Sequence, residues 1–117
     1  MLNKTIWVTS QFVGFHCWPS APESVKFLRD LHRHVFQVKA SVLVTHADRQ
    51  VEFFILKSDL NKGIQSLEKY LKKSPHLSCE AMAIYLLGYL QAKKYRVVGT
   101  QVSEDGENGA LVTNSSP

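Results

Sequence analysis

The hydrophobic pattern of the sequence changes its period at Leu56, and this change constrains the fold more than any other feature. Upstream of it, residues 5–17 and 34–46 alternate or are rich in β-branched side chains, as extended strands are. A third, short strand is expected over residues 51–55. Downstream, a stripe at helical spacing is formed by Leu60, Ile64, Leu67 and Leu71. The chain therefore combines strands with helices.

A second helix and a last pair of strands complete the expected architecture. Ser78 is placed to cap a helix whose residues 81–90 are apolar nearly all round. Residues 95–104 and 109–113 are expected to be strands on either side of a tight reversal. The order of strands, two helices and strands predicts an α+β fold, with an antiparallel four-stranded sheet and two helices on one face.

The length of 117 residues is that of one domain, and we expect a single domain over residues 1–117 with a flexible end at 112–117. No apolar run approaches the ~20 residues of a membrane-spanning helix, and the N-terminus lacks the apolar centre of a secretion signal. A cytoplasmic protein with no membrane partner is expected. The two cysteines, Cys17 and Cys79, are too few for a disulfide scaffold.

The net charge of +4 permits an anionic partner, but the sequence does not favour nucleic acid. A positive patch could form from Arg29, Arg33, Lys39 and Arg49. Aromatic residues that would stack bases do not interleave with these basic stretches, so a solvated face is the simpler interpretation. Phosphate groups on a small ligand could use Arg29 or Arg33 equally well.

Three histidines are expected to meet at one rim of the sheet. His32 and His34 point to the same side of a strand, and His16 ends the strand before it. If the two strands pair antiparallel, the end of the first lies beside the start of the second. Three neutral imidazoles suit zinc and leave its fourth position open, as in catalytic sites. Histidines also cap strands and face water, and His46 and His76 show that this chain uses the residue elsewhere.

Four segments, in order along the chain, resemble the 6-pyruvoyl and 6-carboxytetrahydropterin synthase family. They are F-x-x-F-H at 12–16, LHRHVFQV at 31–38, SCEAMA at 78–83 and VSED at 102–105. In that family a histidine ends the first strand, an HGHNY-like motif opens the second, a T-x-E-like motif opens the second helix, and a glutamate closes the third strand. The resemblance implies a T-fold, whose barrels form when subunits associate as a homohexamer or another trimer-based oligomer. Free sheet edges also favour self-association.

The resemblance implies roles for individual residues. His16, His32 and His34 would bind zinc. Glu104 would hold the amino-pyrimidine edge of a pterin, because a carboxylate accepts two parallel N–H bonds, and Glu80 would assist in anchoring it. Taken without the resemblance, Glu104 is more simply a surface acid beside a turn, and Glu80 an acid favoured in the first turn of a helix.

The chain departs from the family at the positions that move protons. Leu28 occupies the position of the family's catalytic cysteine, four residues before the HxH pair. Arg33 occupies the position of the family's glycine between the two histidines. The family's Asp-His pair has no match in SLEKYLKKS. Two residues could replace the missing base: Cys79, because a helix N-terminus favours a thiolate, and His76, which lies near it in the sequence. A buried, inert thiol is the alternative for Cys79.

Two functions follow from the resemblance and its gaps. The first is a zinc-dependent lyase of the pterin synthase type that acts on a substrate like dihydroneopterin triphosphate. Biopterin-like, folate or deazapurine chemistry, as in queuosine biosynthesis, would share the scaffold. The alternative is a catalytically inactive T-fold protein that binds a pterin- or purine-like ligand.

Overall fold

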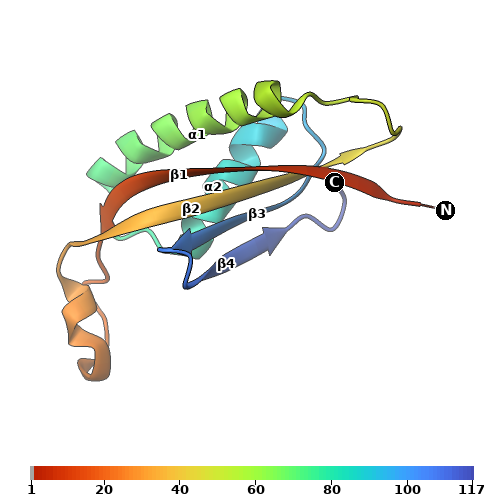
Figure 1. The fold of residues 1–117 in the computed structure, drawn as a ribbon. Helices are drawn as coiled ribbons and strands as arrows, with labels where there is room; N and C mark the ends of the chain where they lie inside the picture. Colours follow the sequence, from red (N-terminus) through yellow and green to blue (C-terminus); the bar gives the residue numbers. More distant parts are fainter. Residues whose placement is uncertain (1) are drawn as a thin grey trace.

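Two long antiparallel strands, β1 (Lys4–His16) and β2 (His32–Val44), form the frame of the computed structural model, which describes residues 2–117 (Figure 1). Every residue of β1 has a partner on β2, and the pairing ends with His16 opposite His32. Because side chains alternate between faces, this register decides which residues of the two strands share a face.

Two shorter strands extend the sheet. β3 (Val97–Glu104) pairs with β2, and β4 (Asn108–Thr113) pairs with β3. The strand order is β1-β2-β3-β4 and every pairing is antiparallel, which confirms the expected four-stranded sheet. A short 3-10 helix, η1 (Glu23–Arg29), lies in the connection between β1 and β2, beyond the end of the sheet (Figure 1).

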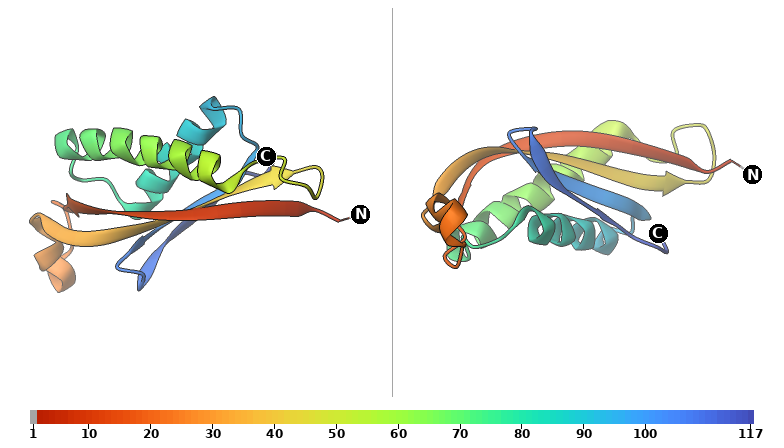
Figure 2. Two further views of the ribbon diagram at one scale, coloured as in Figure 1. Left: turned by 45° about the horizontal axis from the view of Figure 1, so that its top comes forward. Right: turned by 90° about the horizontal axis from the view of Figure 1, so that it is seen from below.

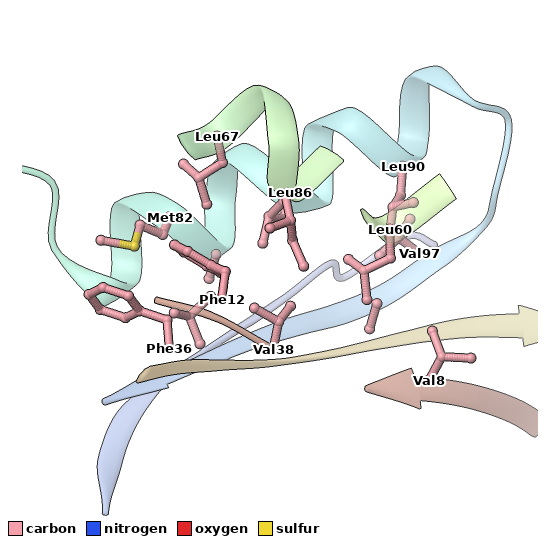
Figure 3. Packing of buried hydrophobic residues seen from close by; sticks show 14 of the residues in the cluster. Val8, Phe12, Phe36, Val38, Leu60, Leu67, Met82, Leu86, Leu90 and Val97 are labelled. Atoms are coloured by element: carbon pink, nitrogen blue, oxygen red, sulfur yellow. The ribbon is translucent and has the colours of Figure 1, made fainter. Parts of the chain in front are cut away.

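Both helices, α1 (Phe53–Lys73) and α2 (Cys79–Ala92), lie on the same face of the sheet (Figure 2). Their apolar residues pack onto those of the strands to form one core (Figure 3). The helices contribute Leu60, Leu67, Met82, Leu86 and Leu90, and the strands contribute Val8, Phe12, Phe36, Val38 and Val97. The expected placement of two helices on one face is confirmed.

The predicted cap of the second helix is present. The Ser78 side chain accepts a hydrogen bond of 3.1 Å from the backbone N–H of Ala81, which satisfies one of the free N–H groups of the first turn of α2. The helix therefore starts at Cys79, directly beside the end of the sheet that carries the histidines.

The prediction of a short strand over residues 51–55 is wrong. Helix α1 begins there, at Phe53, because the Glu52 carboxylate accepts hydrogen bonds from the backbone N–H of Phe54 and caps the helix. The β-prone side chains that suggested a strand stand exposed on the first turn of α1, with Phe54 80% and Ile55 62% accessible. Local propensity was overridden by the cap and by the absence of a neighbouring strand to pair with.

At the C-terminus, Val112 and Thr113, which fell both in the expected last strand and in the expected flexible end, belong to strand β4. Each has a register partner on β3. Neither helix of the described residues combines the length and the apolar character that crossing a membrane requires.

The sheet face that points away from the helices has no covering element within residues 2–117 (Figure 2). Large apolar side chains are exposed on the strands of this sheet, and four of them are Trp7, Val13, Phe15 and Leu111. Strands β1 and β4 are the two edges of the sheet. The described chain therefore leaves one sheet face and two strand edges without a partner.

Candidate metal centre

The register of β1 and β2 brings the three histidines together. His16 lies opposite His32, and His34, two residues further along β2, lies on the same face opposite Gly14. A side chain at Gly14 would crowd this place, because a Cβ atom there would lie 3.1 Å from ring atoms of both Phe12 and Phe36.

The imidazole rings face one another at short range. The ring centroids of His16 and His32 are 4.5 Å apart, those of His16 and His34 5.2 Å, and those of His32 and His34 5.0 Å. Glu104 joins them: each of the four residues offers one ligand atom, and these atoms all lie within 4.8 Å of one another. The sequence predicted the convergence of the histidines but not the carboxylate among them.

Two of the rings are oriented by backbone carbonyls. His16 Nδ1 lies 2.9 Å from the carbonyl oxygen of Leu77, and His32 Nδ1 lies 2.9 Å from that of Asp30. A carbonyl can only accept, so each Nδ1 carries the proton and donates it. The lone pair of each ring is then on Nε2, as in metal-binding histidines whose other nitrogen is held by an acceptor.

The third ring is oriented by Asp105, a residue that the sequence did not single out. One carboxylate oxygen of Asp105 accepts from His34 Nδ1 at 2.8 Å, and the other accepts from the backbone N–H of Val35 at 2.8 Å. Asp105 has a φ of 56°, in the left-handed region that Asp tolerates better than most residues. The hydrogen bond to His34 is the largest of the causes that lower the pKa of Asp105.

Two of the ring nitrogens that point inward form no hydrogen bond within residues 2–117. His16 Nε2 and His34 Nε2 are buried without a hydrogen bond, although buried polar atoms nearly always have one. The pKa of His16 is lowered, and burial is the largest cause. The hydrogen bond to the Leu77 carbonyl and the charge of Glu104 raise this pKa, whereas the positive charges that His32 and His34 would carry lower it further. A neutral ring with a free, buried Nε2 is what a metal ligand must be, so these residues fit zinc.

Glu104 points into the histidine cluster. It lies opposite Phe36 at the end of β3, and alternation with the buried Val102 places it on the face of the helices. Its Oε2 lies 2.9 Å from His16 Nε2 and 3.5 Å from His34 Nε2. Its Oε1 accepts a hydrogen bond of 3.0 Å from the Asn108 side chain.

A cavity of about 490 Å³ opens beside the cluster. This is within the usual size of small-molecule sites. Glu80 lines it from the first turn of α2, and Leu28 lines it from η1. The other lining residues are His16, Cys17, Trp18, His32, His76, Leu77, Ser78, Cys79, Glu104, Asn108 and Gly109.

The two candidate proton carriers, His76 and Cys79, both line this cavity, but His76 is exposed and Cys79 is buried. Burial, followed by the charges of Glu104 and Glu80, raises the pKa of Cys79 to about 12. The thiol is therefore protonated at neutral pH, as the alternative of a buried, inert thiol implies, because burial and the two carboxylates disfavour the thiolate. His76 is exposed at the cavity wall and is free of this burial.

No protein-family model and no curated protein matches the chain. Among solved structures, the chain is similar to the 6-pyruvoyl tetrahydropterin synthase of Caenorhabditis elegans, with a TM-score of 0.66 and 14% sequence identity. The match covers 98% of this chain and 98% of that one. The chain therefore has the T-fold over the matched 98% of its length, and at this identity the likeness concerns the fold.

Proposed function

We propose that the protein is a zinc-dependent carbon–oxygen lyase of the pterin synthase type. Its substrate class is a pterin-like molecule with a phosphorylated side chain, such as dihydroneopterin triphosphate. One observation carries this proposal: the Nε2 atoms of two neighbouring histidines are buried without a hydrogen bond beside a cavity of ligand size.

His16, His32 and His34 would hold the ion through Nε2, because each Nδ1 is already engaged with an oxygen acceptor. When bound, zinc supplies a Lewis acid that polarises a substrate oxygen. Leu77, Asp30 and Asp105 fix the rings, so little reorganisation is needed when the ion binds.

The remaining roles belong to groups on the cavity wall. A lyase of this type breaks a carbon–oxygen bond and moves a proton at a neighbouring carbon. The imidazole of His76 is the candidate carrier of that proton, since the Cys79 thiol is protonated at neutral pH. Glu80 and Glu104 are the carboxylates of the wall that could accept the N–H groups of a pterin ring.

The test uses the purified protein, its zinc content and turnover of dihydroneopterin triphosphate. We expect one zinc per chain, and loss of turnover in His76→Ala with the zinc content unchanged. His46→Ala is the matched control, because His46 is an exposed histidine that lines a different cavity. A zinc-loaded protein that releases no product would contradict the lyase assignment.

A second candidate function is binding of a pterin- or purine-like ligand without reaction. Two observations favour binding without reaction. Leu28, an apolar residue on the cavity wall, stands where the pterin synthase family has its catalytic cysteine, and the Cys79 thiol is protonated. This second function predicts that a pterin such as neopterin raises the melting temperature while no product forms.

We also propose that subunits associate through the uncovered sheet face and the edges of β1 and β4. The exposed apolar side chains of that sheet and its unpaired edges support this. The assembly expected from the resemblance is a trimer or a multiple of it.

A further inference from the structure

We infer that Glu104 is the fourth ligand of the metal in the ligand-free protein, so that the centre is closed until a small molecule displaces the carboxylate. This inference rests on the proposed metal site and concerns its resting state. It differs from the role that the resemblance implies for Glu104, which is to hold a pterin ring.

The distances fit ligation. Zinc bonds to histidine nitrogen and carboxylate oxygen are ~2.0–2.2 Å long, so two ligand atoms of a tetrahedral ion lie roughly 3.3–3.6 Å apart. Glu104 Oε2 lies 3.5 Å from His34 Nε2 and 2.9 Å from His16 Nε2. A shift of a few tenths of an ångström would bring the shorter distance into this range.

The chemistry of the facing atoms favours a cation between them. Each Nδ1 donates its proton outward, so a neutral ring of His16 or His34 presents a lone pair at Nε2. The carboxylate of Glu104 presents lone pairs as well, and neither Nε2 atom forms a hydrogen bond with it. Acceptors buried at this separation repel one another unless a positive ion lies between them.

The carboxylate is held in this orientation from its other side. Asn108, at the start of β4, donates to Glu104 Oε1 at 3.0 Å and leaves Oε2 directed at the imidazoles. One carboxylate cannot ligate the metal and also hold a pterin ring with both oxygens. While Glu104 ligates the metal, Glu80, exposed on the wall of the same cavity, is the carboxylate available to an approaching ring.

The test loads the full chain with cobalt(II) in place of zinc and records its visible absorption, which reports the coordination of the ion. Thiocyanate is the probe, because it binds to an open position and changes the spectrum. The variants are Glu104→Gln, which keeps the shape but loses the charge, and Glu107→Gln, the matched control, because Glu107 is an exposed carboxylate in the adjacent turn that does not line the cavity. Zinc affinity is measured for each by competition with a chelator, and circular dichroism checks the fold.

We expect the spectrum of the parent protein to be unaffected by thiocyanate and that of Glu104→Gln to respond to it. Zinc affinity should fall by roughly tenfold or more in Glu104→Gln, since even outer partners of ligands change affinity by ~10–100-fold, and by less than about twofold in Glu107→Gln. A parent protein that binds metal and responds to thiocyanate overturns the inference and spares the metal site. The expected spectra without turnover would instead contradict the lyase and spare the inference, and a parent that takes up no metal overturns both.

Discussion

His16 and His32 lie directly opposite each other at the last position of the pairing between β1 and β2, with ring centroids 4.5 Å apart. Their meeting depends on the register of two strands of 13 residues each. A slip by one residue would turn His32 and His34 to the other face of the sheet. The apolar residues that fix this register are therefore as necessary to the site as the imidazoles.

Gly14→Ala should lower the free energy of unfolding by about 1–3 kcal/mol, because a Cβ atom there would lie 3.1 Å from the rings of Phe12 and Phe36. Urea unfolding of the metal-free protein measures this. Gly88→Ala is the control, since a Cβ atom at Gly88, within α2, meets nothing within 4 Å. Alanine favours a helix over glycine, so that variant should be as stable as the parent or up to about 1 kcal/mol more stable. Equal loss in both variants would argue against the crowding.

Asp105→Asn should weaken zinc binding by about 10–100-fold, because it removes the charged acceptor that orients His34 through Nδ1. Asparagine tolerates the φ of 56° at this position and can still accept from the Val35 N–H, so the turn should be retained. Chelator competition gives the affinity. Asp48→Asn, an exposed carboxylate in the loop at residues 45–52, should bind zinc like the parent.

Cys79 should resist alkylation by iodoacetamide at pH 7.5, because the thiolate is the nucleophile and a pKa of about 12 leaves almost none of it. Because the pKa of the thiol is raised, the neutral form dominates below about pH 12. The rate of alkylation should therefore increase only as the pH approaches this value. Compared with a free thiol of pKa ~8.5, the rate should be roughly 10³-fold lower. Peptide mass spectrometry after timed labelling measures it, and rapid labelling of Cys79 in the folded chain would refute the assignment.

Phe15→Glu should shift the protein towards the monomer if the uncovered sheet face is the assembly surface. Phe15 is 53% exposed in the single chain, and a charge buried at an apolar interface is costly. Sedimentation equilibrium should give a multiple of 13.3 kDa for the parent and about one unit for the variant. Ile84→Glu, also an exposed apolar residue but on α2, should leave the mass unchanged. A parent protein that sediments as a monomer would exclude the assembly.

The sequence was sufficient for features that depend on period. Alternation placed His16, His32 and His34 on one face, and helical spacing placed Leu60, Leu67 and their neighbours in the core. Both patterns reflect which side of a helix or strand faces solvent. The spacing of apolar residues in a single sequence shows this directly. The strand prediction for residues 51–55 was wrong because the apolar residues of this segment follow no period. The capping hydrogen bonds to Glu52 start the helix there.

The site was less predictable where it depends on contacts between distant segments. Alternation from Val102 would have placed Glu104 on the core face, but its approach to His16 requires the pairing of β3 with β2. Asp105 lies in the VSED segment, but no role was assigned to it, because its contact with His34 arises only from a left-handed turn residue that follows the end of β3 beside Val35. The loss of the thiolate at Cys79 depends on burial, which a helix-start argument does not contain.

The length of β1 and β2 also has a practical consequence. The loop at residues 45–52 follows the end of β2 away from the histidines, and at ~3.3 Å per residue the 13-residue strand separates them by roughly 40 Å. A fluorophore or a surface tether attached at the exposed Asp48 would leave the end with the histidines and the cavity untouched. Single-molecule or immobilised assays of ligand entry are thus open to this chain without altering the residues under study.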